Sequence, residues 1–312
     1  MLASASKIFF HLIARSQTLK KLASRYGMRK PSSFARRFIA GETTAEAIEA
    51  ARAVEARGMT VTMDLLGEGV TNLDKADAAT RDYISVVDAM IASGVGRNIS
   101  LKLTQLGLDV DKAIAIDNFR KILERTEPAG FFVRIDMESS PYTEVTLEIF
   151  ETLRRHGSRQ IGVVLQSALY RSEDDLGHVN ALGAGVRLVK GAYKEPKAVA
   201  YRKKADVDAA YARMLKTLLT EGHDPAIATH DPAMIALARQ VARDHHVAPD
   251  RFEFQMLYGV RRDLQAMLVK AGYRVRVYIP FGREWFPYFM RRLGERPANV
   301  LFAIRGILRD AG

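Results

Sequence analysis

Short runs of β-branched and aromatic residues alternate with longer segments of helical period from Met59 onward. Eight such runs cover residues 59–66, 98–104, 131–137, 161–166, 186–191, 226–230, 252–257 and 274–280. Their starts lie 22 to 40 residues apart, which leaves room for a helix and two connections between successive parallel strands. The pattern therefore predicts eight consecutive βα units.

Residues that favour helix ends stand at the edges of several segments between these runs. We expect helices to be capped by Thr43 or Thr44, by Asp111 and by Ser140, and to end before Gly58, Pro128 and Gly157. Beyond the eighth run, Pro287 suits the start of a further helix, and Pro297 suits its end.

The 254 residues from Met59 to Gly312 match the size of a (β/α)8 barrel, which takes about 250 residues. The alternative is an open, doubly wound sheet, which usually has a glycine-rich turn after its first strand. Here the nearest candidate, residues 67–72, lacks the third glycine of that turn. We therefore predict an α/β fold with a TIM-type barrel over residues 43–312 and a basic helical arm over residues 1–42.

The net charge of +11 is concentrated in the predicted arm. Nine basic residues precede the first acidic residue, Glu42, and the remainder of the chain carries 38 basic and 36 acidic residues. Apolar residues alternate with these cations as on amphipathic helices. Three interpretations are open: helices packed on the barrel, a surface that meets anionic lipid, or a transit peptide. We favour packing, because basic amphipathic segments at domain edges commonly cap a core.

The composition excludes several kinds of site. The chain has no cysteine, so disulfides, thiolate metal sites, iron–sulfur clusters and cysteine nucleophiles are all excluded. Its seven histidines form neither a His-x-His pair after the first run nor an HExxH motif, so we expect no metal site. No apolar run approaches the roughly 18 residues typical of a membrane-spanning helix.

Polar residues stand at or near the end of every predicted strand, where barrel enzymes place their chemistry. In chain order they are Asp64, Glu68, Lys102, Asp136, Gln166, Arg187, Lys190, Thr229, His230, Gln255 and Tyr278. A barrel interior otherwise favours Val, Ile and Leu, so this set predicts a functional site at the rim. In the segment after the last strand, helical spacing places Tyr288, Arg291, Arg292 and Glu295 on one face. Two adjacent guanidinium groups suit a small carboxylate, which indicates an acidic substrate.

Two other functions compete with this interpretation. Lys102 and Lys190, near strand ends, would serve a Schiff-base aldolase if burial lowered their pKa. A nucleic-acid-binding module would use the basic arm, but the nearly neutral remainder of the chain argues against nucleic acid as a partner.

Nine motifs together resemble the proline dehydrogenases over residues 60–302. They are LLGE (65–68), SLKLTQLGL (100–108), VRIDME (133–138), VVLQ (163–166), RLVKGAY (187–193), ATHD (228–231), FEFQMLYG (252–259), VYIPFG (277–282) and YFMRRLGERPANV (288–300). The resemblance implies a barrel with non-covalently bound FAD that oxidises L-proline to Δ1-pyrroline-5-carboxylate, the first step of proline catabolism. Hydride would pass to the flavin N5 and the electrons to a quinone.

The resemblance also implies roles for individual residues. Arg291 and Arg292 would clamp the substrate carboxylate, and Glu68 would act as a gate over Arg291. The reacting end of the substrate would lie beside Lys102 and Asp136, between walls formed by Ala192, Tyr193, Leu257, Tyr278 and Tyr288. The flavin would contact Met137, Gln166, Arg187, Lys190, Gly191, Ala192, Thr229, His230 and Gln255, with Arg187 near N5. Phe281 stands where the family commonly has tyrosine, and Asp231 where many members have asparagine. The second departure puts the flavin contact just after His230 in question.

The expected location is the cytoplasm, because the absence of cysteine fits a reducing compartment and no continuous apolar segment typical of a secretory signal is present. Since electrons in the family pass to membrane quinone, peripheral contact between the arm and the inner face of the cytoplasmic membrane is an open alternative. The composition of the arm permits that contact without requiring it.

Overall fold

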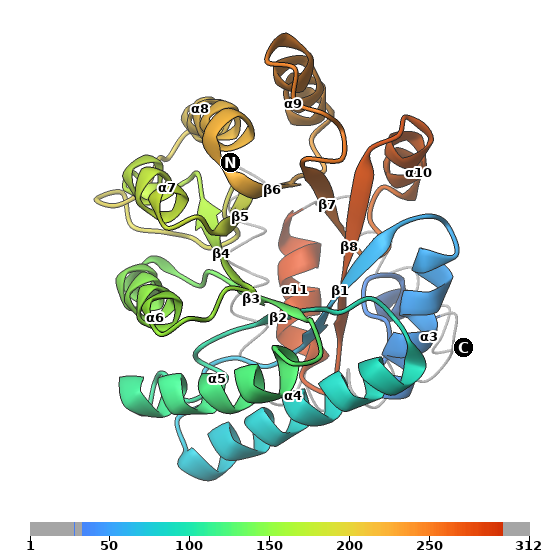
Figure 1. Ribbon diagram of the computed structural model, residues 1–312, viewed down its shortest axis with the longest axis vertical. Coiled ribbons are helices and arrows are strands. Elements are labelled where there is room, and N and C mark those ends of the chain that lie inside the picture. Colours follow the sequence, from blue (N-terminus) through green and yellow to red (C-terminus); the bar gives the residue numbers. More distant parts are fainter. Residues whose placement is uncertain (1–27, 29–32, 296–312) are drawn as a thin grey trace.

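The computed structural model describes residues 28 and 33–295 as a closed parallel barrel (Figure 1). Its strands are β1 (Thr60–Leu65), β2 (Asn98–Leu101), β3 (Phe132–Ile135), β4 (Ile161–Gln166), β5 (Gly185–Val189), β6 (His223–Ala228), β7 (Glu253–Leu257) and β8 (Arg274–Phe281). The eight predicted runs and the predicted barrel are confirmed. Pairing of β1 with β8, from Thr60 opposite Arg276 to Leu65 opposite Phe281, closes the sheet and excludes the open alternative.

Helices surround these strands, and one further helix lies inside the ring in Figure 1. The outer helices are α3 (Thr44–Glu55), α4 (Leu73–Ser93), α5 (Lys112–Thr126), α6 (Thr143–Arg155), α7 (Ser172–Ala181), α8 (Lys204–Glu221), α9 (Pro232–Asp244) and α10 (Arg262–Lys270). This further helix is α11 (Trp285–Glu295). Within the described part of the chain, no helix is long and apolar enough to cross a membrane.

Local chemistry explains where these helices begin. Thr43 and Glu46 form a reciprocal capping box at α3, and the Asp111 carboxylate accepts a hydrogen bond from Ala113 N at the start of α5. Two predicted starts are wrong. Ser140 lies inside a short 3-10 helix, η2 (Ser140–Tyr142), which precedes α6. Helix α11 begins at Trp285, and Pro287 is tolerated because amide groups in a first turn lack intrahelical partners.

The barrel interior is more polar than the sequence pattern suggests. Asp64 and Arg187 lie within β1 and β5, not beyond their ends. Arg187 donates to Ser100 on β2 and to Gln255 on β7, two strands that do not neighbour β5. Such contacts are possible only across the interior. The alternate strand positions are buried and apolar, and they pack against the outer helices.

The last residues of the predicted arm pack against α11. Phe38 and Ile39 belong to an apolar cluster with Trp285 and Phe289 of α11. The backbone of Arg37 approaches Gly259 so closely that a Cβ at residue 259 would lie 1.6 Å from the Arg37 carbonyl oxygen. This contact requires glycine at that position. Residues 1–27 and 29–32 lie outside the described residues, and with them most of the arm to which the three interpretations apply.

Candidate active site

A cavity of about 730 Å³ opens at the carboxyl ends of the strands, beneath α11. Its wall contains every predicted substrate- and flavin-contacting residue: Lys102, Asp136, Met137, Gln166, Arg187, Lys190, Gly191, Ala192, Tyr193, Thr229, His230, Gln255, Leu257, Tyr278, Tyr288, Arg291 and Arg292. Glu68 lies outside this wall but reaches Arg291. The side chain of Glu295 lies outside the described part of the structure.

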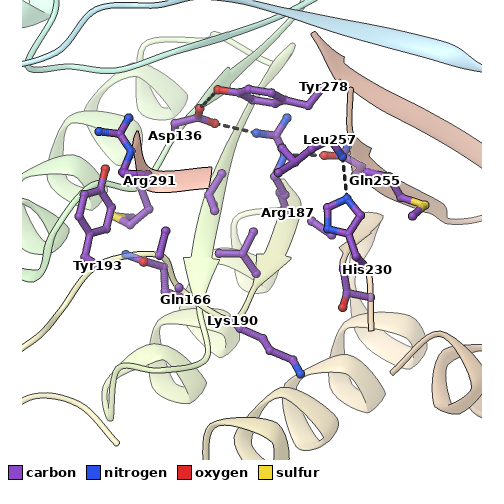
Figure 2. Close-up of a pocket in the computed structure, with 18 of the residues that line it drawn as sticks. Asp136, Gln166, Arg187, Lys190, Tyr193, His230, Gln255, Leu257, Tyr278 and Arg291 are labelled. Atoms are coloured by element: carbon purple, nitrogen blue, oxygen red, sulfur yellow. Dashed lines mark hydrogen bonds and ion pairs between the residues drawn. The ribbon is translucent and has the colours of Figure 1, made fainter. Parts of the chain in front are cut away.

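Asp136, directly after β3, contacts Arg187 of β5 and Tyr278 of β8 (Figure 2), and it also lies near Lys102, directly after β2. Its Oδ1 accepts a hydrogen bond of 2.6 Å from Arg187 Nη1, and its Oδ2 accepts one of 2.7 Å from the Tyr278 hydroxyl. Lys102 Nζ lies 3.7 Å from the same Oδ2. Arg187 is held further by Gln255 Oε1 at 2.5 Å, so its guanidinium has a fixed direction toward the cavity.

Lys102 stands between two carboxylates. Its Nζ lies 3.3 Å from Asp64 Oδ1, and Asp64 is fully buried. Burial lowers the pKa of the Lys102 ammonium, but the carboxylates of Asp64 and Asp136 outweigh burial and hold the pKa above the ordinary lysine value. Lys102 therefore remains a cation at neutral pH.

Two arginines of α11, Arg291 and Arg292, also line the cavity. Arg291 Nη1 donates to Glu68 Oε1 at 2.7 Å, and the Arg292 guanidinium carbon lies 5.2 Å from the Tyr288 ring centre. Burial lowers the pKa of Arg291, but the charges of Glu68 and Tyr193 reverse this and raise it overall. The Arg291 guanidinium thus keeps its positive charge for a ligand in the cavity, and Arg292 adds a second guanidinium beside it.

At the other end of the cavity lie Lys190, which is paired with two carboxylates, and His230, which is hydrogen-bonded to the backbone. Lys190 Nζ contacts Asp208 Oδ1 at 2.5 Å and Asp231 Oδ2 at 2.7 Å. His230 Nε2 accepts a hydrogen bond of 2.9 Å from Leu257 N, which links β6 to β7. At Gly191, φ is +115° and an added Cβ would lie 3.2 Å from Gln166 Oε1. Glycine therefore keeps this wall open.

Sequence reasoning missed Glu138 and Thr104, which lie just behind the wall. Glu138 Oε2 accepts a hydrogen bond of 2.7 Å from the Thr104 hydroxyl, and Glu138 Oε1 accepts one of 3.2 Å from Thr104 N. Both residues are buried. Burial raises the pKa of the Glu138 carboxyl to about 7, although the Thr104 hydrogen bond and the Lys102 charge oppose the rise. A sequence feature that could have indicated a role for Glu138 is its position two residues after Asp136.

Comparison with known proteins gives consistent matches. A model of the family described as Proline dehydrogenase matches residues 47–305. Identity is 41% over 301 residues to Proline dehydrogenase 2 of Bacillus subtilis (strain 168), covering 96% of this chain and 98% of that protein. Identity to Proline dehydrogenase of Deinococcus radiodurans is 42% over 281 residues, covering 89% of this chain and 91% of that one.

Solved structures of larger proteins contain the same barrel. Proline utilization A (PutA) from Bdellovibrio bacteriovorus, inactivated by N-propargylglycine, matches with a TM-score of 0.78 and 28% identity. The match covers 83% of this chain and 32% of that one, so this chain spans about a third of the larger protein.

The raised pKa of Glu138 makes the free energy of unfolding depend on pH. A carboxyl with a raised folded-state pKa contributes stability at low pH that is lost as the pH rises from 4.5 through about 7. Glu138→Gln is neutral throughout and should escape this loss. Between pH 5 and pH 8, denaturant titrations should show the variant gaining about 2–3 kcal/mol relative to wild type. Exposed Glu124→Gln serves as the control; a pH-independent difference for Glu138→Gln would contradict the assignment.

Proposed function

This chain belongs to the proline dehydrogenase family and is an oxidoreductase of proline catabolism, and we propose that it oxidises L-proline to Δ1-pyrroline-5-carboxylate with non-covalently bound FAD. The observation that carries the proposal is the cavity itself. The Asp136–Arg187–Tyr278 network and the α11 arginines Arg291 and Arg292 line the same cavity. This combination suits a small ring that carries a carboxylate.

The residues of the cavity wall suit FAD. A volume of about 730 Å³ lies within the roughly 300–1,000 Å³ usual for ligand and cofactor sites. Donors and cations that suit a ring edge and a pyrophosphate come from Gln166, Arg187, Lys190, Thr229, His230 and Gln255, beside Met137, Gly191 and Ala192. When bound, FAD would accept at N5 the hydride that leaves the ring carbon beside the proline nitrogen, and would pass the electrons to a quinone.

The substrate would be oriented by charge at one end and by shape at the other. Arg291 and Arg292 would hold the proline carboxylate with paired donors. Lys102 and Asp136 would lie beside the reacting carbon, between Ala192, Tyr193, Leu257, Tyr278 and Tyr288. Holding the ring in one pose supplies much of the rate, because reacting atoms must approach within about 3–3.5 Å. Apolar and aromatic walls also keep water out.

Glu68 would act as a gate. In the structure its Oε1 accepts a hydrogen bond from Nη1 of Arg291, the group proposed to bind substrate. Glu68 lies on the loop between β1 and α4, and the paired Arg291 side chain is 16% exposed. Closure of that loop over a bound ring would therefore combine charge pairing with exclusion of water.

The Schiff-base aldolase is disfavoured by the lysines themselves. A nucleophilic lysine needs a lowered pKa, whereas the pKa of Lys102 is raised by Asp64 and Asp136 against the effect of burial. Lys190 is paired with two carboxylates, Asp208 and Asp231. Neither amine is therefore free to act as a nucleophile.

The proposed electron transfer to a membrane quinone supports peripheral contact between the arm and the membrane. Vesicle flotation of the full-length chain tests that contact.

Anaerobic titration with L-proline tests the proposed reaction. The purified protein should be yellow, and addition of L-proline should bleach the flavin absorbance at a one-to-one ratio of product to flavin. A quinone analogue should restore the colour. A colourless protein that is trapped by borohydride with a carbonyl substrate would instead support the aldolase.

Removal of either clamp arginine should weaken proline binding and leave the flavin in place. For Arg291→Ala and Arg292→Ala we expect KM for L-proline to rise by about 30- to 700-fold, which corresponds to about 2–4 kcal/mol of lost binding. The matched control is Arg283→Ala, an exposed arginine just before α11. Steady-state kinetics measure KM for each variant, and the flavin content is measured in parallel. An unchanged KM in both clamp variants rejects the assignment.

A further inference from the structure

The loop that carries Glu68 is fastened to one residue of the neighbouring turn. Gly69 N donates to the Thr104 hydroxyl at 3.0 Å, and Val70 N donates to the Thr104 carbonyl at 3.0 Å. Thr104 follows β2 and is 1% exposed. Glu68 directly precedes these two tethered residues, so the position of its carboxylate depends on Thr104.

Thr104 is in turn oriented by Glu138. A threonine hydroxyl has a single proton. In this structure that proton is directed at Glu138 Oε2, 2.7 Å away, which turns the hydroxyl lone pairs toward Gly69 N. An ionised Glu138 requires this arrangement because a carboxylate only accepts hydrogen bonds. A neutral carboxyl can donate its own proton and removes the requirement.

The surroundings make the charge of Glu138 matter to Glu68. The facing ionisable groups are Lys102, which stabilises the Glu138 carboxylate, and Glu68, which repels it. The charge of Glu138 also helps to raise the pKa of the hydroxyl groups of Tyr83, Tyr142 and Tyr193. Because the pKa of Glu138 is raised to about 7, both protonation states are present near neutral pH.

We propose that Glu138 is a positioning residue that acts through Thr104 to hold the Glu68 loop in register with Arg291. Ionised Glu138 fixes the Thr104 hydroxyl, Thr104 fixes Gly69 and Val70, and Glu68 then meets Arg291 at 2.7 Å. Protonation of Glu138 weakens its hold on the orientation of the Thr104 hydroxyl. The inference rests on the proposed function, because the gate matters only if Arg291 binds the substrate.

A double-mutant cycle through Glu68 separates positioning from general structural damage. Glu138→Gln and Thr104→Val should each raise KM for L-proline by about 3- to 10-fold at pH 8, with kcat changed less than about twofold. Thr104→Ser keeps the hydroxyl and should behave like wild type. In a Glu68→Ala background, neither Glu138→Gln nor Thr104→Val should raise KM further.

The pH profile supplies a second readout. The ratio of KM in Glu138→Gln to KM in wild type should be near one at pH 6, where wild-type Glu138 is largely neutral, and should reach its full value at pH 8. KM effects that persist in the Glu68→Ala background, or a ratio independent of pH, would overturn the proposal. If L-proline does not bleach the flavin absorbance of the wild-type protein, the proposed function itself is wrong, and this result is distinct from any outcome of the double-mutant cycle.

Discussion

The Asp136 carboxylate is the interaction on which the site depends. It accepts hydrogen bonds from Arg187 of β5 and Tyr278 of β8 and lies near Lys102, so it links residues from opposite sides of the barrel. In a desolvated interior these groups cannot be left half-paired, because an uncompensated buried charge costs several kcal/mol. The network therefore fixes the directions of its members before any ligand arrives. Preorganisation of this kind gives polar groups their catalytic value.

The second wall of the site depends on packing. Arg291 and Arg292 are presented by a helix whose apolar residues, among them Trp285 and Phe289, pack against Phe38 and Ile39. That cluster seats α11 over the barrel mouth, and the Gly259 contact with Arg37 locks the arm beside β7. The end of the arm thus positions the proposed substrate clamp, although none of its described side chains lines the cavity. A polar network inside the barrel and an apolar cluster outside it together set the spacing between the two walls.

Much of this architecture could be predicted because its determinants are local. Alternating β-branched runs define the strands, and Thr43 and Asp111 cap their helices as their side chains dictate. The helix starts predicted at Ser140 and Pro287 were wrong, because serine and proline fit the first helical turn as well as its cap. The polar interior was underestimated, since Asp64 and Arg187 are satisfied only by partners far along the chain. Thr104 and Glu138 were missed for the same reason: 34 residues separate them, and no local pattern joins them.

The rate of flavin reduction in Asp136→Asn is the sharpest test of the role assigned to this network. The variant keeps the shape of the side chain but loses the charge that aligns Arg187, Tyr278 and Lys102. Stopped-flow mixing with saturating L-proline should show reduction slowed by about tenfold or more, with flavin content unchanged. Reduction at the wild-type rate would mean that the Asp136 network does not align the reacting groups, and that the site does not depend on it.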